Sequence, residues 1–338
     1  MATPVPKLFQ SIQVGTTNLQ HRVVLAPMKR ARADERHVLG ELGLEYYKQR
    51  TSTSGTLAIS EGTCIVLHAC GCTNVPGIWS DEQIAAWKLI TDAVHANGSF
   101  IYLQLWVLGR AAEGDVLRKA GGYEVIALSA IALEGRETPR ALTFYVTAAE
   151  NAVLKAGFDG VEIQTTGGYF LDQFIQPVTN TRTDEYGGSL ENRLRFVLEI
   201  TDAMVKAIGA NKVGIRISPY LKIQGMGMPD PIPTYTKLVA STRDSYHDLA
   251  PSTKFLRDIW GNRPYITNGS YERDTAIEVV EKEGGLVSFG RYFISNPDLP
   301  RRLKENIELA LDDPKTWWAQ GAEGYTDYPF ATEVKPEV

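Results

Sequence analysis

Two polar side chains interrupt segments of this chain that otherwise have the composition of buried strands. Gln104 lies within Leu103-Gln104-Leu105-Trp106, and Arg216 lies within the apolar segment 213–219. A polar or charged side chain in a protein core costs roughly several kcal/mol unless it is paired. A planar anionic or amide-bearing ligand would pair both side chains, and an internal salt bridge is the alternative.

Two glycine-containing turns near the C-terminus give a second chemical signal. Asn268-Gly269-Ser270 and Phe289-Gly290-Arg291 each follow a strand-like segment. Glycine lets backbone N–H groups approach a phosphate closely, and an arginine can add a bidentate clamp. Paired turns after the seventh and eighth strands are the usual phosphate site of a (β/α)8 barrel. The turns therefore predict a phosphorylated cofactor.

Three cysteines lie close together in the sequence. With His68 they form the pattern Cys64-x3-His68-x-Cys70-x-Cys72. This spacing matches no common zinc site, and three cysteines do not suggest the disulfide framework of a secreted protein. We therefore expect free thiols in a loop near solvent, and no bound metal.

The elements that must position these residues alternate along the whole chain. Short β-rich apolar segments alternate with helical ones, which indicates parallel strands linked by crossover helices. Helices are expected after Ser80, where Gln83 completes a capping box, from Leu194 to Ile208, and from Tyr271 to Glu283. Strands are expected at residues 21–27, 56–62, 100–106, 160–166, 213–219, 263–269 and 286–290.

An eight-stranded barrel needs one strand more than these. The interval from Pro219 to Tyr265, where the sixth strand belongs, contains no strand-like apolar run. The strand is either deleted or belongs to residues that this sequence lacks. No linker or repeat divides the chain, so we expect one domain over residues 1–338, an α/β (β/α)8 TIM barrel that is incomplete or rearranged around its sixth strand.

Composition excludes several classes of partner. The chain has 338 residues, 43% of them hydrophobic, and a formal net charge of −5. It offers no broad basic surface for nucleic acid and no apolar run of membrane-spanning length or typical of a signal peptide. We expect a cytoplasmic protein, monomer or homodimer, that acts on a small molecule.

Many ordered motifs of the chain resemble the old yellow enzymes, which are FMN-dependent ene-reductases. The fungal members of secondary-metabolite pathways are the most similar group. The matching stretches include Leu25-Ala26-Pro27-Met28, Ser60-Glu61-Gly62-Thr63, Gln104-Leu105-Trp106, Asp172-Gln173-Phe174, Arg182-Thr183-Asp184-Glu185-Tyr186-Gly187-Gly188-Ser189, Phe289-Gly290-Arg291 and Gly324-Tyr325-Thr326-Asp327-Tyr328-Pro329-Phe330.

The resemblance implies FMN as cofactor and NADPH or NADH as reductant. It also implies a role for each matching residue. The isoalloxazine ring would contact Pro27, Met28, Gly62 and Gln104, its pyrimidine edge and the ribityl chain would lie by Arg216, and the phosphate would be held by Gly269, Gly290 and Arg291.

The substrate motif departs from the family. Its members have His-x-x-Asn-x-Tyr or His-x-x-His-x-Tyr, whereas this chain has Gln164, Gly167 and Tyr169 at those positions. In the family the pair donates hydrogen bonds to the substrate carbonyl and the tyrosine protonates the α-carbon. Gln164 keeps an amide donor, but Gly167 has none, and the loss of one such donor costs roughly 10²–10³-fold in rate.

Lys29 is a second departure, because the family commonly has threonine or cysteine there. Pointing inward, it would favour reduced flavin or bind a substrate oxygen, whereas pointing outward it would be solvated. We expect Tyr169, Gln164 and Lys29 to be catalytic. The substrate would contact Trp106, Gly167 and Tyr328, while Phe170 and Tyr325 would line an aromatic pocket or pack in the barrel.

Three functions fit these residues. The first is an NAD(P)H-dependent ene-reductase for an α,β-unsaturated carbonyl compound. The second is a flavin-bound isomerase, dehydrogenase or cyclase with little ene-reductase activity, because the usual donor pair is replaced. The third is a catalytically silent protein that binds FMN or a partner.

Overall fold

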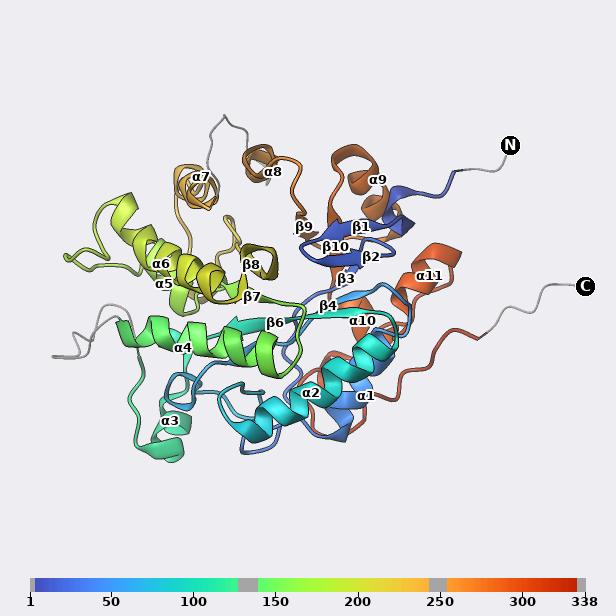
Figure 1. Cartoon of the computed structure of the whole chain (residues 1–338), viewed down its shortest axis with the longest axis horizontal. Coiled ribbons are helices and arrows are strands. Elements are labelled where there is room, and N and C mark those ends of the chain that lie inside the picture. The colour runs from blue at the N-terminus through green and yellow to red at the C-terminus, as the bar shows by residue number, and fades with distance from the viewer. Residues whose placement is uncertain (1–3, 127–138, 243–253, 333–338) are drawn as a thin grey trace, which may run out of the picture.

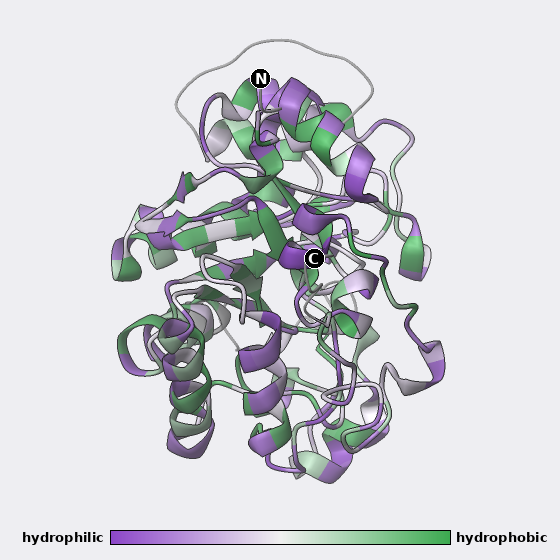
Figure 2. Cartoon of the chain, turned by 90° about the vertical axis from the view of Figure 1, so that its right-hand side faces the viewer, coloured by the Kyte–Doolittle hydropathy of each residue, from purple (hydrophilic) through white to green (hydrophobic). Residues whose placement is uncertain are grey.

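The computed structural model describes residues 4–126, 139–242 and 254–332. A curved parallel sheet lies at the centre and helices surround it (Figure 1). Apolar residues concentrate in the strands, whereas hydrophilic residues are frequent on the surrounding helices (Figure 2). No helix in the described part of the chain is both long and apolar enough to span a membrane.

All seven expected strands form, most of them shorter than expected. The strand order is β8-β7-β6-β4-β3-β10-β9, every neighbouring pair is parallel, and β5 pairs with β6 beside this path. Buried β-branched and leucine side chains give these segments their preference for strands. The strands are β3 (Val23–Leu25), β4 (Leu57–Ile59), β5 (Thr63–Cys64), β6 (Phe100–Trp106), β7 (Gly160–Gln164), β8 (Val213–Arg216), β9 (Ile266–Asn268) and β10 (Leu286–Phe289).

The sheet is open between β8 and β9, where the sixth barrel strand belongs. The described residues between these strands form η6 (Ile223–Gly225), α7 (Ile232–Ser241) and α8 (Lys254–Trp260), and none of them forms a strand. Residues 243–253 lie outside the described part of the chain. The expected α/β barrel, incomplete or rearranged around its sixth strand, is therefore confirmed in the part of the chain that the structure describes.

An antiparallel hairpin packs against the end of the sheet where the strands begin. It consists of β1 (Ile12–Val14) and β2 (Thr17–Leu19). Val14 and Leu19 are buried with Leu57 and Leu286, which open β4 and β10. This packing leaves the opposite end, where the strands finish, for the polar residues.

Helix boundaries follow the expected capping signals. Ser80 accepts a hydrogen bond from the Gln83 backbone, and the Gln83 side chain accepts one from Ser80, so the predicted capping box begins α2. The remaining helices are α1 (Glu41–Arg50), α2 (Asp81–Ala96), α3 (Gly114–Gly121), α4 (Pro139–Glu150), α5 (Phe170–Ile175), α6 (Leu190–Ile208), α9 (Arg273–Glu283), α10 (Arg291–Ser295) and α11 (Leu299–Glu305).

The expectation of free, solvent-near thiols is wrong. Cys64 and Cys70 form a disulfide, and Cys72, which stays free, is buried as well. Cys64 ends β5, and its backbone N–H donates to Pro76 O, so the loop folds back on itself. The cysteines pack with Trp106 and Leu108. Their burial and pairing depend on this fold of the loop, which the spacing alone does not reveal.

Candidate active site

Polar side chains from three adjacent strands meet at the carboxyl ends of β6, β7 and β8. Gln104 is paired in register with Glu162, and Gln164 with Arg216. Glu162 and Gln164 lie on the same face of β7, since side chains alternate along a strand. Gln104 Nε2 donates to Glu162 Oε1 at 2.7 Å and to Gln164 Oε1 at 3.4 Å. The predicted residues Gln104, Gln164 and Arg216 are thus brought together.

Glu162 is the member of this cluster that sequence reasoning missed. Its side chain is buried, and burial raises its pKa, while the positive charge of Arg216 and the hydrogen bond from Gln104 act in the opposite direction. The sequence left two explanations for the buried polar groups of Gln104 and Arg216, a bound ligand or pairing within the protein. Glu162 pairs with both and therefore supplies part of the internal pairing. The sequence did hold a signal for Glu162: it lies two residues before Gln164 on the same strand, so both side chains share one face.

Tyr169 lies directly after β7 and precedes α5. Its ring meets Trp106 edge-on, with centroids 5.1 Å apart and an interplanar angle of 89°. Burial raises the pKa of Tyr169, and the charge of Lys29 and a hydrogen bond from Gln224 lower it. A phenol that stays protonated is a suitable proton donor to a carbanion.

Lys29 turns toward the Tyr169 side of the site, although its side chain is exposed. Its Nζ donates to Cys72 Sγ at 3.2 Å and lies 5.9 Å from the centroid of the Trp318 ring. Neither simple expectation, fully inward or fully solvated, describes this position. The amine lies at the edge of the site, next to the Cys72 thiol, and its charge lowers the pKa of Tyr169.

The backbone at Gly167 has a conformation that suits glycine. Its φ is +74°, in the left-handed region that most side chains avoid. A Cβ added there would lie 3.2 Å from Tyr169 Cε2 and 3.8 Å from Ile223 Cδ1. The Tyr169 ring and the loop after β8 therefore border the space that a side chain at residue 167 would use.

The loop after β8 contributes Gln224, a site residue that the sequence did not suggest. It takes a left-handed conformation, with φ of +53°, and its side chain reaches Tyr169. Arg110 holds the loop, because its Nη2 donates to Gln224 O at 2.5 Å and to Met226 Sδ at 3.3 Å. Gln224 lies in a Pro/Gly-rich loop without strand or helix periodicity, which is why no pattern pointed to it.

The two predicted phosphate turns lie side by side. Asn268, the last residue of β9, is the register partner of Ser288, one residue before the end of β10, which places Gly269 close to Gly290. Gly269 has φ of +156°, and an added Cβ would meet nothing within 4 Å, so its backbone borders open space. A Cβ on Gly290 would lie 3.1 Å from Met28 Sδ. Glycine backbone beside open space, with exposed Arg291 next to it, fits a phosphate group.

The predicted ring-binding positions also lie near these groups. Gly62 approaches Trp106 so closely that an added Cβ would be 3.0 Å from the indole ring. Pro27 and Met28 follow β3, which lies beside β10 in the sheet. Trp106 Nε1 is buried without a hydrogen-bond partner in the described structure. The strand ends thus present apolar surface together with the polar cluster, as a flavin ring requires.

Three aromatic residues lie elsewhere. Tyr325 is fully buried and stacks on Tyr46, with ring centroids 4.3 Å apart, and Phe170 packs edge-on against Phe174. Both therefore pack in the core. Tyr328 accepts a hydrogen bond from the Asp313 backbone at 3.1 Å, and none of its described contacts reaches Tyr169.

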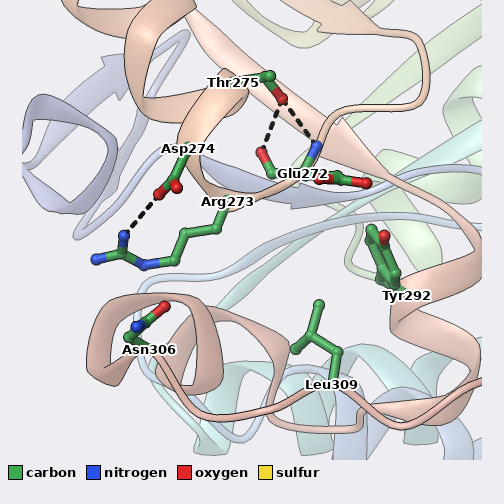
Figure 3. A pocket seen from close by; sticks show the side chains of 7 residues that line it. All are labelled: Glu272, Arg273, Asp274, Thr275, Tyr292, Asn306 and Leu309. Atoms are coloured by element: carbon green, nitrogen blue, oxygen red, sulfur yellow. Dashed lines mark hydrogen bonds and ion pairs between the residues drawn. The ribbon is translucent and has the colours of Figure 1, made fainter.

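A separate hollow of about 350 Å³ lies between the start of α9 and the segment after α11. Its charged groups are already engaged, because Arg273 pairs with Asp274 (Figure 3) and the Glu272 side chain, the N-cap of α9, accepts a hydrogen bond from the Thr275 backbone. No predicted site residue lines it. The lining residues are Glu272, Arg273, Asp274, Thr275, Tyr292, Asn306 and Leu309.

Comparison with known proteins gives concordant matches. The model of the NADH:flavin oxidoreductase / NADH oxidase family matches residues 7–310. Chanoclavine-I aldehyde reductase fgaOx3 of Penicillium roqueforti is 43% identical, with 98% of each chain covered. A protein of Epichloe festucae var. lolii named "Probable inactive reductase easA" is 44% identical, covering 98% of this chain and 97% of its own. The old yellow enzyme homologue of Zymomonas mobilis superposes with a TM-score of 0.85 at 36% identity, covering 96% of this chain and 99% of that chain.

Proposed function

Because the chain belongs to the NADH:flavin oxidoreductase / NADH oxidase family and is an FMN-dependent oxidoreductase of the old yellow enzyme type, we propose that it reduces the carbon–carbon double bond of an α,β-unsaturated aldehyde or related carbonyl compound. NADPH or NADH serves as reductant. The name of the related chanoclavine-I aldehyde reductase supports an aldehyde, and the fungal relatives support a role in secondary metabolism. We propose further that residues 1–338 form one FMN-binding domain and that the protein is a cytoplasmic monomer or homodimer.

The observation that carries this proposal is the polar cluster beside Tyr169. Gln104, Gln164 and Arg216 meet on adjacent strand ends, and Tyr169 follows the strand that bears Gln164. Bound FMN supplies hydride transfer. Gln104 and Arg216, with Pro27 and Gly62, would hold its ring.

The phosphate end of the cofactor would be held by Gly269, Gly290 and Arg291. Met28 would lie between this end and the ring-binding positions, because its Sδ is near the Gly290 backbone. A cation beside the ring favours the anionic reduced form of a flavin, which is the role proposed for Arg216.

Three side chains act on the substrate in this proposal. Gln164 donates an amide N–H to the substrate carbonyl, since its Oε1 already accepts from Gln104. Lys29 acts on the same carbonyl group from the Cys72 side. Tyr169 keeps its proton and delivers it to the α-carbon. Trp106 orients the Tyr169 ring, and Gly167 completes the proposed substrate contacts, whereas Tyr328, hydrogen-bonded to the Asp313 backbone, is left out of them.

A second candidate is a flavin-bound isomerase, dehydrogenase or cyclase. It is favoured by Gly167, which offers no hydrogen-bond donor to a carbonyl, and the name "Probable inactive reductase" of the easA relative fits little reductase activity. In that reaction Tyr169 would move a proton without net reduction.

Anaerobic turnover separates the two candidates. The purified protein, reconstituted with FMN, is incubated with NADPH or NADH and a panel of enals and enones. Reductase function predicts one saturated product for each nicotinamide consumed. An isomerised product without nicotinamide consumption would support the second candidate, and a protein that fails to bind FMN would overturn both.

A further inference from the structure

Lys29 and Cys72 form a pair of nucleophilic groups at the edge of the site. Lys29 Nζ lies 3.2 Å from Cys72 Sγ, and Cys72 retains its thiol while Cys64 and Cys70 are joined. None of the ion pairs in the described ranges involves Lys29. An exposed amine next to a thiol, rather than a carboxylate, is accessible to a reactive carbonyl.

Resting on the proposed function, we infer that Lys29 captures an aldehyde substrate covalently as a protonated imine, with Cys72 transferring the proton and Tyr169 beside the adduct. Lysine amines form Schiff bases with carbonyl substrates once they are deprotonated. Thiols and amines have reference pKa values of about 8.5 and 10.4, close enough for proton exchange across one hydrogen bond. The substrate class is therefore the α,β-unsaturated aldehydes.

The capture step balances without any oxidant or reductant. The Lys29 ammonium gives one proton to water, and the free amine attacks the aldehyde carbon to give a carbinolamine. The Cys72 thiol protonates the carbinolamine hydroxyl, which leaves as water while the C=N bond forms, and Cys72 then regains a proton from water. One aldehyde and one ammonium give one iminium cation and one water.

The iminium replaces the activation that the missing donor pair would give. Its positive charge is conjugated with the alkene, so the β-carbon becomes electrophilic even though Gly167 offers no hydrogen bond. After hydride has added there, the resulting enamine takes a proton at its α-carbon from Tyr169. Water then hydrolyses the resulting iminium, releasing the saturated aldehyde and the Lys29 ammonium, and Tyr169 takes up a proton from solvent.

Reductive trapping tests this inference. The FMN-reconstituted protein is incubated with hexanal, which has no alkene for thiol addition, and sodium cyanoborohydride, and alkylated lysines are located by peptide mass spectrometry. Lys29 should be labelled at least about tenfold faster than Lys222, an exposed lysine in the loop after β8. Cys72→Ala should slow Lys29 labelling several-fold, and Lys222→Arg should leave it unchanged. Equal labelling of Lys29 and Lys222 would overturn the inference, and undiminished labelling in Cys72→Ala would overturn the role of Cys72.

A turnover comparison separates this inference from the proposed function. Lys29→Arg keeps the positive charge but cannot form an imine, so its ratio of enal to enone turnover should fall about tenfold. If that ratio is unchanged while enals are still reduced, the proposed function stands and imine capture is refuted. If Lys29 is trapped as an imine but no enal or enone is reduced, imine capture stands and the proposed reductase function is refuted.

Discussion

Returning a hydrogen-bond donor to residue 167 should restore reduction of simple enones. The change is Gly167→Asn, and its benefit is one oxyanion-type donor, worth roughly 10²–10³-fold in rate. Two costs oppose it. The φ of +74° places the residue in the left-handed region, at roughly 1–2 kcal/mol for most side chains and less for asparagine. The new Cβ would lie 3.2 Å from the Tyr169 ring, which must shift by a few tenths of an ångström.

Gly167→Ala is the matched control, because it carries the same Cβ contact and backbone strain without a donor. NADPH oxidation with cyclohexenone is followed anaerobically in both variants, each with its FMN content measured. We expect Gly167→Asn to exceed Gly167→Ala by at least about tenfold in kcat/KM, and addition of Gln164→His to raise it further. Equal rates in the two variants would refute the reasoning that the missing donor limits enone reduction.

Three further changes test other parts of the site. Tyr169→Phe should abolish product formation while FMN binding and flavin reduction by NADPH stay intact; full product formation would show that the proton comes from elsewhere. Arg216→Met should weaken FMN retention and lower the flavin reduction potential, measured by dialysis and by dye equilibration, and unchanged values would remove Arg216 from the cofactor site. Glu61→Gln should change the pH dependence of stability, since burial raises the pKa of Glu61 from 4.5 to about 7. The folded protein then holds this proton more tightly than the unfolded chain, so the Glu61 contribution is present below about pH 4.5 and is lost as pH rises through 7, by on the order of 3 kcal/mol. Urea unfolding should therefore show the variant gaining stability relative to the parent between pH 5 and pH 8, and a constant difference would contradict the assigned burial.

The strands were predictable because strands that are buried on both faces consist almost wholly of apolar residues. Segments such as 100–106 are almost wholly apolar, so Gln104 stood out within them as a residue with a special role. The open barrel was predictable for the converse reason, since no such segment lies between Pro219 and Tyr265. Glycine turns at Gly269 and Gly290 were informative because their order along the barrel fixes which strand ends they follow.

Contacts between distant segments were not predictable. Gln224 reaches Tyr169 only because Arg110 holds the loop after β8, and the two segments are far apart in the sequence. The Cys64–Cys70 disulfide depends on how the loop after β5 folds back, and its spacing argued for free thiols instead. Lys29 has no partner in its own segment, so only the folded chain shows that its amine meets Cys72.

Flavin re-oxidation by an enal tests the central claim most directly. The FMN-reconstituted protein is reduced anaerobically with one equivalent of NADPH, an α,β-unsaturated aldehyde is added, and the absorbance of the bound flavin is followed while the product is identified. The account predicts that the oxidised flavin spectrum returns with formation of one equivalent of the saturated aldehyde. A spectrum that stays reduced, or an aldehyde recovered with its double bond intact, would contradict it.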